Sequence, residues 1–259
     1  MAKKGRRKRQ RQLDAAVAAI QRRFGPSALI KGKPARVTDG VSAVPHIPSG
    51  FSELDQALGI GGLPKGKLCE MVGPATSGKT TLALKFLAQA QAGGRQVGYI
   101  DQALYFDPDY AHRCHVDLSR LVVGTVHDLR EALAATESLA RSGGLAALVF
   151  DALDFLWTDP EATASLAATL NRLPPALARS GMTLLILHES AEGSSPALSA
   201  LAHHAAIRLW VVREEWIKEQ EDIRGYKARV EVLKNRLGPA GRRISLAIKF
   251  NGTVRGNGL

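Results

Sequence analysis

The segment Gly73-Pro74-Ala75-Thr76-Ser77-Gly78-Lys79-Thr80 decides the fold of this 259-residue chain. It fits the pattern G-x-x-x-x-G-K-[ST] of a phosphate-binding loop. Residues 67–72 before it predict a short buried strand, and residues 81–90 after it carry apolar side chains at helical spacing. A strand, a glycine-bounded loop and a helix in this order favour anion binding, because backbone N–H groups and a helix N-terminus attract phosphate.

The loop predicts a site for a nucleoside triphosphate and Mg²⁺. Lys79 is expected to reach the β- and γ-phosphates, and the Thr80 hydroxyl to complete the shell of the metal. Asp151 ends the apolar strand predicted at residues 145–150, where a carboxylate lies in the crevice that binds ligands in α/β sheets. We expect Asp151 to hold Mg²⁺ through water, across from Thr80; the alternative is an N-cap of the following helix. The residues expected to bind nucleotide are Gly73, Pro74, Ala75, Thr76, Ser77, Gly78, Lys79, Thr80 and Thr81.

The chain beyond the loop alternates between strand and helix patterns. Continuous apolar strands separated by helices predict an α/β fold with a mainly parallel sheet covered on both faces. Three later strand-like runs are expected to form hairpins, and so to add antiparallel strands to one edge of that sheet. The expected strands are 96–101, 121–123, 145–150, 183–188, 207–213, 228–234 and 244–250, and the expected helices include 50–58, 110–115 and 128–141.

Composition favours a cytoplasmic protein with one sizeable core. The chain is 45% hydrophobic, which suits one main domain with small appendages. No apolar run approaches the roughly 20 residues of a membrane span, and no apolar segment of a secretory signal follows the first basic residues. Cys69 and Cys114 are the two cysteines, which suggests a reduced interior without a disulfide framework.

The positive charge is concentrated at the N-terminus. The formal net charge is +11, and seven cations precede the first acid, Asp14. A basic segment without apolar residues is not expected to fold alone, and it is typical of an arm that binds nucleic acid without regard to sequence. The alternative is a disordered end that only solubilises the chain. The seven cations are Lys3, Lys4, Arg6, Arg7, Lys8, Arg9 and Arg11.

A predicted helix separates this tail from the core. Apolar residues at helical spacing between Gln12 and Phe24 indicate one amphipathic face, which would dock on the chain's own core or on a neighbouring subunit. The expected organisation is therefore a disordered basic tail, a helix with its linker, an ATP-binding core and a short end. Their bounds are 1–11, 12–49, 50–255 and 256–259.

Segments upstream of the loop carry a family resemblance. Residues 19–25, 47–59 and 61–66 read AIQRRFG, IPSGFSELDQALG and GGLPKG. Together with the loop they resemble the RecA recombinase family, at the level of architecture over about residues 12–255. The resemblance implies a RecA-like core that binds ATP and Mg²⁺, single-stranded DNA as a partner, and a first helix that packs on the adjacent protomer of an oligomer.

Two further motifs carry family roles over to this chain. Asp107 and Tyr110, in Asp-Pro-x-Tyr, match residues that lie against the adenine; the alternative is a helix start capped by Asp107. Lys234 and Arg236 match cations that reach the neighbouring protomer's ATP, and Lys-Asn-Arg also resembles the RadA/Sms branch. The alternative for this second pair is a solvated strand end.

The chain departs from the family where ATP is hydrolysed and DNA is held. The position of the water-activating glutamate is Ala103, which leaves Asp101 and Glu189 as secondary candidates for a general base. The position of the glutamine that senses the γ-phosphate is Ser190. Both DNA-binding loops look reduced, and Trp157, beside the first, favours a core position over base stacking.

These departures predict an accessory paralogue. The chain is similar to the ImuA proteins of mutagenic translesion repair, which implies a place in the SOS response, altered ATP hydrolysis and DNA binding, and a recombinase or translesion polymerase complex as protein partner. One alternative is a DNA-dependent ATPase recombinase that forms strand-exchange filaments. The other is a nucleotide-gated binding module without turnover.

Overall fold

The computed structural model describes residues 2–25, 43–153, 160–189, 196–219, 222–250 and 254–255. Contacts divide the chain into two compact units, Met1–Ser42 and Ala43–Leu259. The second unit therefore begins seven positions before the core expected at residue 50. Strand β1 (His46–Ile47) accounts for the difference, because it pairs with β2 (Leu63–Pro64) just ahead of the central sheet.

The first unit is built on helix α1, which spans Ala2–Phe24. The helix begins at Ala2, where a disordered tail over residues 1–11 was expected, and it is continuous with the segment expected to be helical. Lys, Arg, Gln and Ala are good helix formers, so a basic run without proline extends the helix N-terminally. Leu13 and Phe24 are 56% and 65% exposed on α1.

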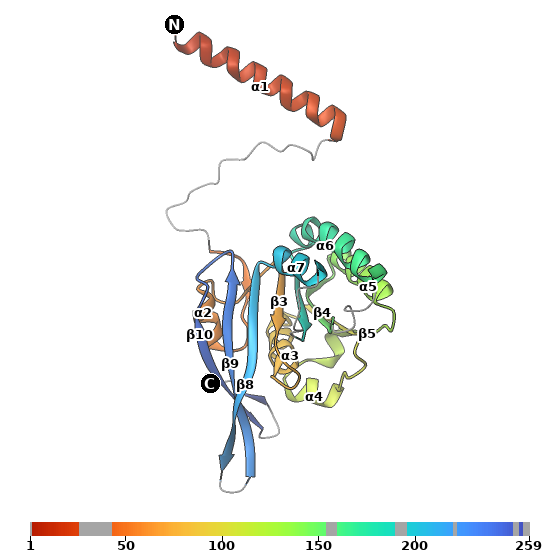
Figure 1. The fold of residues 1–259 in the computed structure, drawn as a ribbon, viewed down its shortest axis with the longest axis vertical. Helices are drawn as coiled ribbons and strands as arrows, with labels where there is room; N and C mark the ends of the chain where they lie inside the picture. The colour runs from red at the N-terminus through yellow and green to blue at the C-terminus, as the bar shows by residue number, and fades with distance from the viewer. Residues whose placement is uncertain are drawn as a thin grey trace. The chain divides into compact units, whose positions relative to one another are not determined.

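A nine-stranded sheet forms the centre of the second unit as far as the structure describes it (Figure 1). Its strands are β3 (Leu68–Val72), β4 (Gln96–Asp101), β5 (Leu121–Thr125), β6 (Leu145–Asp151), β7 (Thr183–His188), β8 (Ile207–Glu219), β9 (Asp222–Asn235), β10 (Arg243–Phe250) and β11 (Val254–Arg255). Their spatial order is β11-β10-β9-β8-β3-β7-β6-β4-β5. The strands from β8 to β5 in that order pair in parallel, and β9, β10 and β11 are antiparallel. The predicted α/β fold is confirmed.

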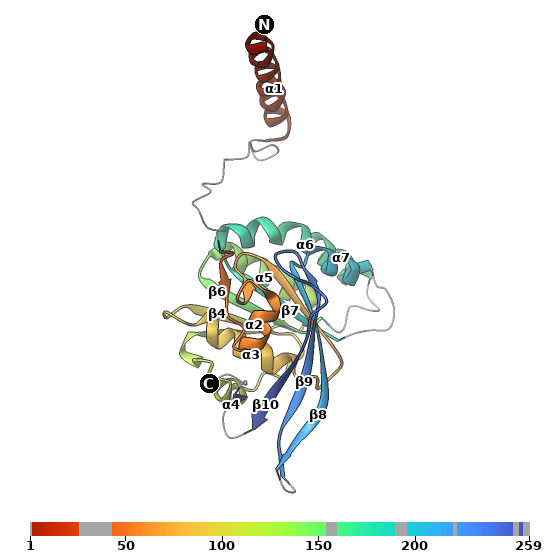
Figure 2. The same cartoon turned by 90° about the vertical axis from the view of Figure 1, so that its left-hand side faces the viewer.

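Helices cover both faces of the sheet (Figure 2). One hydrophobic cluster joins the sheet to the side of α2, α3 and α4, and a second joins it to α5, α6 and α7. Strand β7 shows how one strand contributes to both clusters. Leu185 and Leu187 belong to the first cluster and Leu184 and Ile186 to the second, because successive side chains point to opposite faces of the sheet. The helices are α2 (Ser52–Leu58), α3 (Lys79–Ala90), α4 (Pro108–Arg113), α5 (Leu129–Ser142), α6 (Pro160–Ser180) and α7 (Pro196–His204), with a 3₁₀ turn at Leu118–Arg120.

Strands β8 and β9 form a long hairpin that extends past the parallel part of the sheet (Figure 1). Strand β8 pairs with β3 only over Ile207 to Trp210, so the rest of β8 is held by β9. Cross-strand ion pairs, such as Lys227 Nζ to Glu215 Oε1 at 2.6 Å, line this extension. The outer part of the hairpin therefore combines the backbone pairing of its two strands with charged pairs between them.

No helix among the described residues is long and apolar enough to cross a membrane.

Candidate functional site

The loop between β3 and α3 has the backbone that a phosphate cradle needs. Gly78 lies in the left-handed region at φ 104° and caps α3, which begins at Lys79. A Cβ atom on Gly73 would come within 1.9 Å of the Val211 carbonyl oxygen, so glycine alone fits there. Pro74, Ala75 and Thr76 are exposed, and Thr76 is also left-handed at φ 57°. The predicted strand, loop and helix are confirmed, and the helix directs its N–H groups at the loop.

Lys79 is folded over its own loop. Its Nζ donates to the carbonyl oxygens of Gly73, at 2.8 Å, and of Pro74, at 2.9 Å. The buried Ser77 hydroxyl oxygen has no hydrogen-bond partner among the described atoms. An ammonium group and an unsatisfied hydroxyl beside a helix N-terminus are donors suited to phosphate oxygens, and so the loop fits a nucleotide phosphate chain.

Thr80 and Asp151 meet beside the loop, as expected. The Thr80 hydroxyl donates to Asp151 Oδ2 at 3.1 Å, and the Tyr99 hydroxyl donates to the same oxygen at 2.5 Å. Burial, followed by the Asp151 charge, raises the pKa of Tyr99. Because Tyr99 stays protonated, it holds Asp151 in place as a hydrogen-bond donor. A hydroxyl and a carboxylate are the hard oxygen ligands that Mg²⁺ takes together with water and phosphate.

Two tyrosine hydroxyls converge on Thr81, the second residue after Lys79. Tyr110 lies 2.6 Å from Thr81 Oγ1, and Tyr226 of β9 donates to the same oxygen at 3.2 Å. The Tyr226 hydroxyl also occupies the space that a Cβ atom on Gly78 would need. Burial raises the pKa of Tyr110 to about 12, so it remains a neutral hydroxyl.

Tyr226 was not predicted as part of this site. A single tyrosine in a strand has no spacing signal, and the contact depends on the β8–β9 hairpin passing beside the loop. Trp216 of β8 lies 6.2 Å from the Tyr226 ring, and the Arg213 guanidinium stacks 4.2 Å above the Trp216 ring. The hairpin thus brings an aromatic pair and a cation to the edge of the site.

Asp107 starts α4, as the alternative interpretation proposed. Its side chain accepts a hydrogen bond from the Tyr110 backbone N–H at 3.0 Å, and Pro108 takes the first helical position. This cap orients Tyr110 toward Thr81. Contact of Asp107 and Tyr110 with an adenine stays a prediction.

Position 103 lies next to the site although it carries no base. The backbone N–H groups of Gln102 and Ala103 donate to the Asp151 carbonyl oxygen at 2.8 and 3.4 Å. Asp101 is the poorer of the two secondary candidates, because its carboxylate accepts the N–H groups of Tyr105 and Phe106, at 3.1 and 3.0 Å, in the turn after β4. Glu189 is half-buried at the end of β7.

A buried ionic cluster lies on β3, the strand that leads into the loop, and on its two neighbouring strands. This cluster was not predicted. Glu70 of β3 is fully buried, and its carboxylate contacts His188 Nε2 at 2.7 Å and Arg208 Nε at 2.5 Å. The His188 carbonyl oxygen in turn accepts the Gly73 N–H at 3.4 Å. The three side chains come from adjacent strands, so they meet through sheet order that no local pattern encodes.

Lys234 and Arg236 lie at the end of β9, and their side chains reach the C-terminal end of α7. Lys234 Nζ donates to the carbonyl oxygens of Ala202, at 2.6 Å, and His203, at 3.0 Å, and Arg236 also donates to His203. Desolvation lowers the pKa of Lys234. Cations at a helix C-terminus satisfy its last carbonyl groups, so both have a structural role within the chain. Their predicted action on a neighbour's ATP remains a prediction.

Other predicted positions lie outside the described residues. These are Trp157 and Ser190, together with most of both short loops and the side chains of the first six tail cations. Arg11, the seventh, is described and exposed.

Comparison with known proteins gives a consistent result. The family model of the RecA N-terminal domain matches residues 11–173. The chain is 32% identical to Protein RecA of Brucella anthropi, over 95% of this chain and 73% of that protein. It is 33% identical to Protein RecA of Streptomyces ambofaciens, over 97% and 72% of the two chains. It is 34% identical to Protein RecA of Frankia alni, over 96% and 77%.

Proposed function

The chain belongs to the RecA family, and we propose from this premise that it is an ATP-binding protein of DNA repair and recombination. The observation that carries the proposal is the arrangement of Lys79, Thr80 and Asp151 around a glycine-bounded loop at a helix N-terminus. In this proposal Lys79 and the loop N–H groups bind the phosphates, and Thr80 and Asp151 hold Mg²⁺. ATP, when bound, supplies the γ-phosphoryl group whose transfer to water is the chemistry of such a site.

We further propose that the protein is an accessory, ImuA-like paralogue with slow ATP hydrolysis. The support is Ala103, which lies against the Asp151 backbone at the edge of the metal site but carries no proton acceptor. A positioned general base typically contributes about 10²–10⁴-fold to a rate, so its absence would make the bound nucleotide long-lived. Such a protein would use ATP mainly to hold together an oligomer, or to hold a DNA-repair partner such as a recombinase or translesion polymerase complex. We propose that it acts in the cytoplasm.

Restoring the base is expected to speed hydrolysis. Ala103→Glu places a carboxylate beside the Thr80–Asp151 pair, and we expect single-turnover ATP hydrolysis to rise by about 10²-fold or more. Ala103→Gln is the matched control, because it has the same shape without a proton acceptor. Rates are measured with and without single-stranded DNA.

Two results would contradict this accessory role. Brisk, DNA-stimulated hydrolysis by the natural chain would favour a strand-exchange recombinase and make Glu189 the first candidate base. A tight ATP complex with no turnover in either variant would favour a nucleotide-gated binding module.

We propose single-stranded DNA as the polyanionic partner, bound through the basic first part of α1. If five to seven of the seven cations neutralise phosphates, the slope of log affinity against log salt is expected to be roughly −3.5 to −5. Replacing all seven with glutamine, which is also a good helix former, should flatten the slope and remove most of the affinity. The measurement is fluorescence anisotropy of a labelled oligonucleotide at several salt concentrations.

The double variant Lys234→Gln, Arg236→Gln tests the competing explanation of DNA binding. If DNA instead binds along a groove between assembled protomers, this pair should weaken DNA binding by breaking assembly, while the α1 variant keeps the full slope. That pattern would end the proposal that α1 is the DNA contact.

A further inference from the structure

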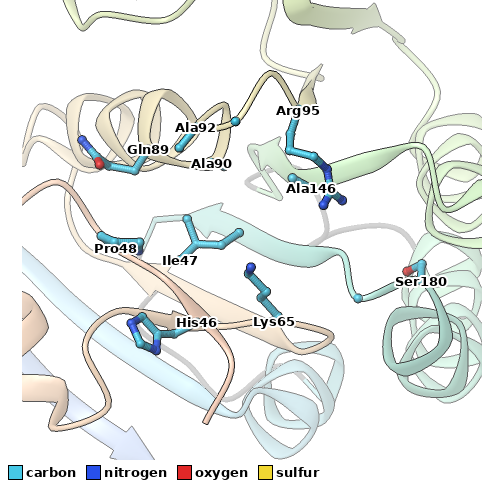
Figure 3. Close-up of a pocket in the computed structure, with 12 residues that line it drawn as sticks. His46, Ile47, Pro48, Lys65, Gln89, Ala90, Ala92, Arg95, Ala146 and Ser180 are labelled. Carbon is cyan, nitrogen blue, oxygen red and sulfur yellow. The ribbon is translucent and has the colours of Figure 1, made fainter. Parts of the chain in front are cut away.

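A cavity of about 420 Å³ opens at the amino ends of the parallel strands (Figure 3). Its size falls within the range of small-ligand and side-chain pockets. Residues from five separate parts of the chain line it, namely β1, the turn before β3, the end of α3 with the turn that follows it, the start of β6, and the end of α6 with the turn that follows it. The residues that matter to its chemistry are Ile47, Lys65, Ala90, Arg95 and Ala146.

This cavity is separate from the phosphate loop. Lys65 precedes β3, whereas the loop begins at Gly73, directly after that strand. A five-residue strand at about 3.3 Å per residue places the two roughly 17 Å apart, at opposite ends of that strand. The proposed nucleotide chemistry therefore uses none of the cavity's residues.

The cavity carries positive charge without a counter-charge. The side chains of Lys65 and Arg95 extend into it from different sides (Figure 3). No aspartate or glutamate is among the lining residues, and neither cation forms an ion pair in the part of the chain that the structure describes. Two cations that face one hollow repel each other, and an anion between them would relieve that repulsion.

Two of the other three polar side chains of the wall, those of His46 and Ser180, are already engaged, and the third, Gln89, is a neutral amide. His46 Nδ1 lies 2.8 Å from the Val44 carbonyl oxygen. The Ser180 hydroxyl donates to the Leu177 carbonyl oxygen at 3.3 Å and accepts the Met182 N–H at 3.2 Å. Lys65 and Arg95 are therefore the main donors that the wall offers to a ligand.

The base of the cavity is apolar. Ile47, Ala90 and Ala146 are 4%, 5% and 7% exposed, and they come from β1, α3 and β6. A ligand that matches both features carries a carboxylate for the cations and an apolar group for the base. DNA fits this shape poorly, because its phosphates repeat along a strand and need a track of cations rather than one pair in a hollow.

We propose that this cavity binds an acidic segment of a partner protein, with carboxylates between Lys65 and Arg95 and a neighbouring aliphatic side chain against Ile47 and Ala146. The charge complementarity and the apolar base are the grounds for choosing a peptide. The proposal does not depend on ATP binding at the other end of β3.

The test uses the full chain, labelled with ¹⁵N, and the probe peptide acetyl-Leu-Asp-Asp-Leu-amide. We expect chemical-shift changes at the Gly93 and Gly181 amides, which line the cavity, and none at Gly73 or Gly78 of the phosphate loop. Lys65→Ala with Arg95→Ala should weaken binding of the peptide by about tenfold, since the double variant removes two exposed ion pairs at once. Lys218→Ala with Lys249→Ala, which removes two other exposed cations, should leave the affinity unchanged.

Several results would overturn the proposal. Equal binding of acetyl-Leu-Asn-Asn-Leu-amide would remove the role of charge, and equal binding by the Lys65/Arg95 variant would place the peptide elsewhere. Cavity shifts with inorganic phosphate but not with the acidic peptide would make this a small-anion site. Loss of single-stranded DNA affinity in the Lys65/Arg95 variant would assign the cavity to the DNA path.

Discussion

Lys79→Ala is expected to abolish ATP binding while leaving the fold intact. The lysine supplies the one ammonium group that folds over the described loop, and its contacts there are two carbonyl oxygens that water can satisfy instead. At a hundred times its Kd, ATP with Mg²⁺ stabilises a protein by about 2.7 kcal/mol. For a chain of this size that corresponds to roughly 5–10 °C in Tm, and the variant should show no shift. Thermal unfolding with and without nucleotide measures the difference.

Lys67→Ala is the matched control for this experiment. Lys67 is exposed at the other end of β3, so its removal should keep the full ATP-induced shift. The nucleotide site would be refuted if the natural chain showed no shift at saturating ATP, or if Lys79→Ala kept it. Circular dichroism of the variant checks that the sheet is retained.

Glu70→Ala is expected to cause the largest loss of stability, about 3–5 kcal/mol. The fully buried carboxylate is the shared partner of His188 and Arg208, and its removal leaves the Arg208 charge without that partner in a mainly apolar sheet. Because a domain of this kind has about 5–15 kcal/mol in total, the variant should unfold at a much lower urea concentration. Equilibrium urea unfolding followed by circular dichroism gives the change in free energy.

Glu215→Ala is the control with an exposed carboxylate. Its ion pair with Lys227 on the β8–β9 hairpin is short, at 2.6 Å, but both side chains are about half exposed, at 60% and 48%. An exposed pair contributes about 0–1 kcal/mol, so this variant should unfold near the natural chain. A loss below about 1 kcal/mol in Glu70→Ala would show that the buried cluster is not a major source of stability.

Local patterns in the sequence predicted the parallel half of the molecule well. Strands β4 and β7 match residues 96–101 and 183–188, because buried parallel strands are continuous apolar runs whose ends are marked by polar residues. The phosphate loop was predicted because its glycines and Lys79 serve a backbone geometry that needs those residue types. The position of Asp151 beside the loop was predicted because the residue ends an apolar strand, and the carboxyl ends of parallel strands lie together.

Other features depend on contacts that no local pattern encodes. The outer part of the β8–β9 hairpin, residues 214–219 and 222–227, was missed because charged side chains hide the alternation of a half-buried strand. Tyr226 reaches Thr81 only because that hairpin passes beside the loop. The first part of α1 was not expected to be helical, because its lack of apolar residues was taken as disorder although lysine and arginine form helices readily.

The central place of β3 in the sheet has a consequence for folding during synthesis. Leu68 pairs with Leu184, and Cys69 pairs with Ile207, so both neighbours of this strand are made long after it leaves the ribosome. Contacts of such high sequence separation form slowly, because the intervening chain must first be closed into a loop. Until β7 and β8 arrive, both edges of an apolar strand are open to pairing with another chain. The nascent chain is therefore most exposed to aggregation after β3 and the phosphate loop have been synthesised and before β7 and β8 pair with β3. A chaperone that shields β3 would act in that interval.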